Sequence, residues 1–167
     1  NDLEDVDDNN DGVIDIDANS NALVDIYNLN TLDAVRHNLA GSGLKLSAEH
    51  ENDQIGCPVV FTGENYTHQC NGYELVADID FDSNQDKIIS SEDEFWNDGS
   101  GWLPIGIDGS APFATTFRGN GHIIRSLYIN RPETDIVGLF GYLSDSGGTI
   151  SELGVTSAAQ GVTGRNY

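Results

Sequence analysis

Apolar residues recur at three- and four-residue steps in one stretch of the chain, residues 28–43. Asn30 and Asp33 offer an N-cap and a first-turn acid, and Gly41 stands where a helix would end. The pattern predicts one helix that buries a leucine-rich face. This face comprises Leu29, Leu32, Val35 and Leu39.

After residue 70 the pattern changes to short runs in which apolar and polar residues alternate. The segment "GYELVADIDF", residues 72–81, places its apolar side chains on one face and predicts a strand. The later apolar runs lie between glycine-rich turns, and none is long enough for a second helix. These runs are "GWLPIG", "FATTFRGNGHIIRSLYI", "IVGLFGYL" and "GTISELGV".

Two of these runs repeat the same apolar spacing. The apolar positions of "IIRSLYI" and "TISELGV" match at a constant offset of 26 residues, which is typical of stacked solenoid coils. We therefore predict an all-β fold in the form of a parallel β-helix, with an antiparallel β-sandwich as the alternative. The matched pairs are Ile124 with Ile150, Leu127 with Leu153, and Ile129 with Val155.

Charge narrows the range of partners. The 167 residues carry a formal net charge of -21 with only seven lysines and arginines. Nucleic acids and anionic membrane surfaces bind basic faces, so the charge argues against both, and divalent cations are the natural counterions. No apolar run approaches the roughly 18 residues of a membrane span, and no signal segment opens the chain. A chain that begins at Asn1 without methionine is typical of a mature product or a fragment.

The negative charge is concentrated in two acidic islands, residues 1–17 and 78–98, with eight carboxylates each. The first island reads D-x-N-x-D-G-x-x-D, a spacing at which alternate oxygens can converge on one hard cation while Gly12 permits the turn. It resembles the calcium loops of thrombospondin type 3 repeats and dockerins. Position twelve is Ala18, so Asp5 or Asp17 would complete the shell. The predicted calcium ligands are Asp5, Asp7, Asn9, Asp11, the backbone of Val13, and Asp15.

The second island contains "DSNQDKIISSED", residues 82–93, which resembles an EF-hand loop. Lys87 replaces the turn glycine and Asp93 the bidentate glutamate, while Ile89 retains the apolar position eight. We predict calcium here in preference to magnesium, which takes few protein ligands and retains water. The alternative for both islands is a solvated acidic segment. The predicted ligands are Asp82, Asn84, Asp86, the backbone of Ile88, Ser90 and Asp93.

The two cysteines of the chain, Cys57 and Cys70, lie between turn-forming glycines. A metal site would need C-x-x-C spacing or nearby histidine pairs, which His68 alone does not supply. A disulfide is therefore the better prediction, and it indicates an oxidising, extracytoplasmic compartment. The loop between the cysteines also contains Asn65-Tyr66-Thr67, a glycosylation sequon by pattern.

Several segments together resemble the GLUG-motif repeats of large secreted and cell-surface bacterial proteins, over residues 23–156. In order they are "LVDIYNLNTLDAVRHNLAG", "GYELVADIDF", "GWLPIG", "FATTFRGNGHIIRSLYI" and "VGLFGYL". The resemblance implies a right-handed parallel β-helix with an N-terminal helical cap, serving as a structural or adhesive module without known catalytic residues. Its most specific positions are Gly119, Gly121, Leu127, Gly138, Leu139, Phe140 and Gly141.

These observations predict an acidic calcium-binding segment, 1–22, and a β-helix domain, 23–167. Within the domain we distinguish a helical cap (23–45), a disulfide loop (57–70) and an acidic insert (82–98). The predicted function is an extracellular, calcium-stabilised, non-catalytic module of a bacterial surface protein or filament. Its edges would be covered by copies stacked head to tail, or by adjoining coils of a longer chain.

Two other functions remain open. A module that binds a glycan or a protein would use exposed aromatic side chains, for which Trp96, Trp102, Tyr66 and Tyr128 are the candidates. A polysaccharide-degrading enzyme would need paired carboxylates, and the candidates are Asp108, Asp135 and Asp145.

Overall fold

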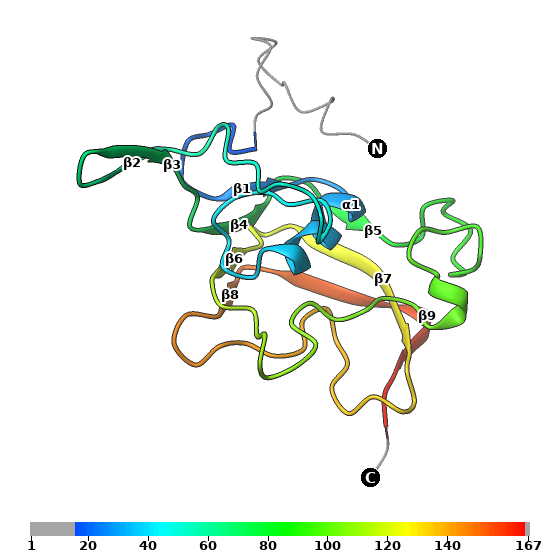
Figure 1. The fold of residues 1–167 in the computed structure, drawn as a ribbon. Coiled ribbons are helices and arrows are strands. Elements are labelled where there is room, and N and C mark those ends of the chain that lie inside the picture. Colours follow the sequence, from blue (N-terminus) through cyan, green and yellow to red (C-terminus); the bar gives the residue numbers. More distant parts are fainter. Residues whose placement is uncertain (1–15, 166–167) are drawn as a thin grey trace.

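The computed structural model describes residues 16–165, which form short strands, one α-helix and two 3-10 turns (Figure 1). The helical elements are α1 (Leu29–Ala34), η2 (Val35–His37) and η3 (Asn97–Gly99). The strands are β1 (Val24–Ile26), β2 (Val59–Thr62), β3 (Asn65–His68), β4 (Gly72–Leu75), β5 (Ile79–Asp80), β6 (Thr116–Arg118), β7 (Ile123–Asn130), β8 (Thr149–Ser151) and β9 (Gly154–Thr163).

The strands of residues 16–165 belong to three sheets. One parallel sheet has the order β1-β4-β6-β8, and a second has the order β5-β7-β9. Along the chain, β4 leads to β5, β6 leads to β7 and β8 leads to β9, each after a few residues. The first strand of each pair lies in the first sheet and the second strand in the second sheet. The antiparallel hairpin β2–β3 forms the third sheet and projects from the body (Figure 1).

The predicted all-β, right-handed parallel β-helix is wrong. Residues 16–165 form a mixed α/β arrangement of parallel and antiparallel sheets with one short helix, and the sheets do not close into a solenoid. Paired residues are not separated by the predicted offset of 26 residues, because Ile150 pairs with Phe117 and Ile124 pairs with Val155. The separation between partners also falls along the first sheet, from Val24–Tyr73 to Phe117–Ile150, so no constant coil length exists.

Helix α1 buries Leu29 and Leu32 of the predicted apolar face, and Val35 is buried in η2, while Leu39 lies beyond both and is half-buried. The helix begins earlier and ends sooner than expected. Its N-cap is Asn28, whose side chain accepts a hydrogen bond from the Thr31 N–H, while the Thr31 hydroxyl accepts one from the Asn28 N–H. This reciprocal capping box fixes the start of the helix, so Asn30 lies inside it. After Ala34 the chain tightens into η2.

The run 72–81 is two strands rather than one. After β4 the chain turns a corner at which Val76 is exposed, and β5 joins the other sheet. Asp78 fixes this corner by accepting hydrogen bonds from the Ile123 N–H, His122 and Arg125. These contacts, led by the Ile123 N–H, lower the pKa of Asp78 to about 2.

The core lies between the two parallel sheets and the segments that join them. Its largest fully buried side chains include Trp102, Tyr73, Phe113 and Phe117. Phe81, Phe95 and Trp102 pack edge to face, with ring centroids 5.2–6.5 Å apart, a favourable arrangement of aromatic rings. The second acidic island is therefore held to the core at Phe81 and Phe95, near its two ends.

Candidate functional site

Asp82 begins the 82–93 loop of the second acidic island, and its carboxylate holds the first half of this loop in place. One carboxylate oxygen of Asp82 accepts a hydrogen bond from the Asp86 N–H at 3.1 Å, and the other accepts one from the Lys87 N–H at 2.8 Å. Asn84 Oδ1 also accepts the Asp86 N–H at 3.0 Å, and Asp86 Oδ1 accepts the Ile88 N–H at 2.7 Å. The oxygens at loop positions one, three and five therefore gather around three consecutive backbone N–H groups.

The middle of the loop has the backbone shape that the sequence pattern implies. Lys87, at position six, has a φ of 74°, the left-handed region in which glycine is favoured. Ile89, at position eight, is buried, and its N–H and carbonyl both bind the side-chain amide of Gln160 on β9. The loop is thus tied to the edge strand of the second sheet.

Asp93 closes the loop from position twelve. Its Oδ1 accepts the Ser83 N–H at 2.9 Å, and its Oδ2 accepts the Ser90 N–H at 2.9 Å. Burial raises the pKa of this carboxyl, but hydrogen bonds from Ser90, Ser83 and Asn84 outweigh it and leave the pKa lowered. Asp93 is therefore held as an anion beside the first turn of the loop.

These carboxylates do not converge on one point. Among residues 16–165, no three His, Cys, Asp or Glu side chains are grouped so that they could hold a metal ion. The predicted ligands of the first island, Asp5, Asp7, Asn9, Asp11, Val13 and Asp15, lie outside the described residues. The calcium assignment therefore stays a prediction at both islands.

A second loop, residues 17–22, repeats the hydrogen bonds of residues 82–87. Asp17 accepts the Asn21 N–H at 3.0 Å and the Ala22 N–H at 2.8 Å. Asn19 Oδ1 accepts the Asn21 N–H, Asn21 Oδ1 accepts the Leu23 N–H, and Ala22 has a φ of 70°. The sequence patterns above did not predict this loop, although the spacing D-x-N-x-N of Asp17, Asn19 and Asn21 is the signal that indicates it.

The side chain of Glu74, on β4, binds the 17–22 loop through hydrogen bonds. It is only 2% exposed and accepts hydrogen bonds from the amides of Asn19, Asn21 and Asn120 at 2.7–2.8 Å. Burial raises the pKa of Glu74, but these hydrogen bonds outweigh it, and the pKa is lowered. Burial also raises the pKa of Asp17, and the nearby charge of Glu74 adds to that rise.

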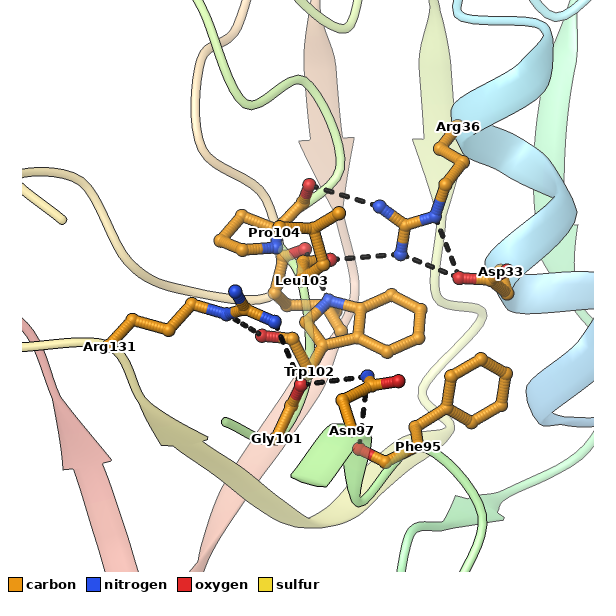
Figure 2. Close-up of polar contacts among 10 residues, drawn as sticks. Asp33, Arg36, Phe95, Asn97, Gly101, Trp102, Leu103, Pro104 and Arg131 are labelled. Carbon is orange, nitrogen blue, oxygen red and sulfur yellow. Dashed lines mark hydrogen bonds and ion pairs between the residues drawn. The ribbon is translucent and has the colours of Figure 1, made fainter. Parts of the chain in front are cut away.

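Two arginines enclose Trp102, one of the aromatic candidates (Figure 2). Arg36 lies 4.8 Å from the centre of the indole and donates to the Leu103 and Pro104 carbonyls. Arg131 donates to the Trp102 carbonyl at 3.1 Å. Trp102 is fully buried, so it has a structural role and cannot serve as a binding platform.

The other aromatic candidates differ in exposure. Trp96 stacks on Tyr128 with their ring centroids 5.5 Å apart, and both side chains are half-buried. Tyr66 is 70% exposed on the projecting hairpin, where it contacts Phe61, itself 69% exposed, at 4.7 Å. Of the four predicted aromatics, Tyr66 is the one that presents its ring to solvent.

The three candidate catalytic carboxylates lie in separate exposed turns. Asp108 accepts hydrogen bonds from Ser110 within its own turn. Asp135 forms an ion pair with Arg165 at 2.9 Å. Asp145 lines a surface hollow together with Gly109, the residue that follows Asp108.

The predicted disulfide between Cys57 and Cys70 is confirmed, with their Cα atoms 5.1 Å apart. Both cysteines are buried, and the bond joins the two ends of the β2–β3 hairpin. The disulfide therefore closes the hairpin segment at the point where the chain enters and leaves the body.

Part of this chain is similar to two much longer proteins. It is 41% identical over 102 residues to halomucin from Haloquadratum walsbyi, a match that covers 60% of this chain and 1% of halomucin. It is 30% identical over 112 residues to a protein named as a Gly-rich membrane protein from Evansella cellulosilytica, covering 62% of this chain and 12% of that protein.

The chain thus spans a small part of each relative. No family model matches it, and no solved structure gives a significant match, so the resemblance to GLUG-motif repeats stays a prediction. None of the helices in residues 16–165 has the length and apolar character that a membrane crossing requires.

Proposed function

We propose that this chain is a calcium-stabilised, non-catalytic structural or adhesive module of an extracellular or cell-surface protein. Surface association is supported by the name of one relative as a membrane protein. The Cys57–Cys70 disulfide supports an oxidising, extracytoplasmic location, because thiols stay reduced in most cytosols.

The observation that supports calcium best is the shape of the 82–93 loop. Side-chain oxygens of Asp82, Asn84 and Asp86 already gather at one turn, and Asp93 returns to the start of the loop. A carboxylate oxygen has two lone pairs, so it can accept an N–H and also bind a cation. Calcium takes six to eight oxygen ligands in flexible geometry, which suits such a loop after small movements of the side chains.

Charge supports the same proposal. Eight carboxylates lie within residues 78–98, in a chain with a net charge of -21. Their mutual repulsion opposes the compact state, and a bound divalent cation would relieve it. Lys87 is the one cation within residues 78–98, and it relieves only part of the repulsion.

Isothermal titration calorimetry with calcium chloride tests this proposal. The double variant D82N/D86N should lose one binding site relative to the unaltered chain. The control D145N/E152Q removes the same charge from two exposed positions elsewhere and should keep that site. Equal calcium stoichiometry in all three proteins would show that the 82–93 loop binds no calcium.

A second candidate function is recognition of a glycan or a protein by the hairpin. The exposed pair Phe61 and Tyr66 favours it, because aromatic rings at 69% and 70% exposure are available for contact. In a glycan-array screen, the unaltered chain should bind and F61S/Y66S should not. No binding by the unaltered chain to any glycan or extracellular protein tested would remove this candidate.

Strands of other chains or of a longer parent are further candidate partners. β8 and β9 each end their sheet order, and the stretch 153–164 around β9 contains no charged residue. An unprotected sheet edge can accept another strand. Sedimentation velocity over a range of concentrations tests self-association: a monomer at every concentration leaves only the adjoining part of a longer chain.

A further inference from the structure

The β2–β3 hairpin is the most exposed element among the described residues. All four residues of β3 are exposed, and the hairpin stands away from the body (Figure 1). Within the part of the chain that the structure describes, its strands pair only with each other, from Val59–His68 to Thr62–Asn65. An added Cβ at Gly63, in the turn, would meet nothing within 4 Å. The end of the hairpin therefore has open space around it.

Asn65 stands at this end, directly after the turn. Asn65-Tyr66-Thr67 is the only N-x-S/T triplet in the 167 residues. Because side chains alternate along a strand, Asn65 and Thr67 share one face of the hairpin, and Tyr66 lies on the other with Phe61. A large group on Asn65 would extend into solvent without displacing the aromatic pair or any core side chain.

Two further features make the triplet accessible to an enzyme. A two-stranded hairpin is marginally stable alone, so local opening of β2–β3 exposes the triplet without disturbing the core sheets. The disulfide at its base, Cys57–Cys70, keeps that opening local and indicates the extracytoplasmic side, where such triplets are modified.

We propose that Asn65 is an acceptor for an N-linked glycan. In this transfer the Asn65 Nδ2 forms a bond to C1 of a sugar carried on a lipid phosphate, and Nδ2 loses one proton. The bond between C1 and the phosphate oxygen breaks, and the lipid phosphate leaves with the electron pair. No group is oxidised or reduced. The proposal rests on the extracytoplasmic location proposed above but not on calcium.

Peptide mass spectrometry of the chain isolated from its source cells is the first test. The peptide that contains residues 65–67 should carry a mass increment that corresponds to whole sugar units. An unmodified Asn65 in this material overturns the proposal, whether or not calcium binds. Alkylation of the same sample without reduction reports whether Cys57 and Cys70 are oxidised, and so separates a failure here from a failure of the proposed extracytoplasmic location.

Variants expressed in a secretory host with an N-glycosylation pathway provide the second test. N65Q and T67A should lose the sugar mass completely, while T67S keeps the hydroxyl and should retain it. Asn65 is exposed, so N65Q should unfold at the same temperature as the unglycosylated chain. Sugar retained on N65Q, or lost from T67S and T67A alike, contradicts the assignment of this triplet.

Discussion

Glu74 shows how a buried carboxylate remains ionised in this protein. Burial alone disfavours the anion, but amide N–H groups of three asparagines surround its two oxygens. Hydrogen bonds that favour the charged form lower the pKa, and here they outweigh burial. Glu74 therefore joins the 17–22 loop to β4 and to Asn120.

The variant Glu74→Gln should lower the free energy of unfolding at pH 7 by about 1–3 kcal/mol, because buried donors lose a charged acceptor. The folded pKa of Glu74 is lowered, so its contribution is present above the unfolded pKa and is lost as the pH falls through the folded value. Urea unfolding at pH 7 and pH 3 should show a smaller difference between variant and unaltered chain at pH 3. A difference that does not change with pH contradicts this account.

Lys87 combines a strained backbone with a charge next to the proposed calcium loop. In chelator, Lys87→Gly should be about 1 kcal/mol more stable than Lys87→Gln, since both variants lose the charge and only the glutamine leaves a non-glycine residue strained in the left-handed region. Lys87→Gln, the control, keeps the strain but removes the charge. Both variants should bind calcium more tightly than the unaltered chain, and in chelator the glycine variant should unfold at a higher temperature than the glutamine variant.

At the scale of elements, the disulfide is the main constraint on the projecting hairpin. The variant C57S/C70S should destabilise the protein by about 3 kcal/mol, because the bond closes a loop of sequence separation 13 in the unfolded chain. F61S/Y66S alters exposed hairpin side chains and should change stability by less than about 0.5 kcal/mol. Urea unfolding of both variants measures the contrast, and equal midpoints would contradict it.

Local patterns identified some elements but not their partners. The spacing of Leu29, Leu32 and Val35 predicted the face that α1 and η2 bury. The isolation of the two cysteines predicted their bond. The N-cap was misplaced because Asn28 and Asn30 both suit a cap, and only the contact with Thr31 selects the first.

The alternation of apolar and polar residues did not predict which strands pair with each other. Alternation marks Ile150 as a core-facing residue, yet it cannot say that its partner is Phe117 rather than Ile124, because packing decides register. The corner at Asp78 was missed for a similar reason, since its fixing contacts come from residues 122–125. Of the candidate site, the 82–93 loop could be read from side-chain spacing, while the contact of Ile89 with Gln160 depends on the tertiary fold.

At the scale of the whole molecule, a net charge of -21 opposes compaction. Short strands in two small parallel sheets provide a limited core, so relief of this repulsion should affect the stability of the entire chain. The proposed role of calcium follows from this balance: the ion would bind the folded chain and not the unfolded one.

Thermal unfolding in calcium and in chelator, at equal ionic strength, tests this central claim most directly. A ligand that binds only the folded state adds roughly 2.7 kcal/mol at a hundredfold excess over Kd. For a chain of this size the account predicts a Tm higher in calcium by about 5–10 °C. Magnesium at the same concentration should give a smaller rise. Identical melting temperatures in calcium and in chelator would contradict the account.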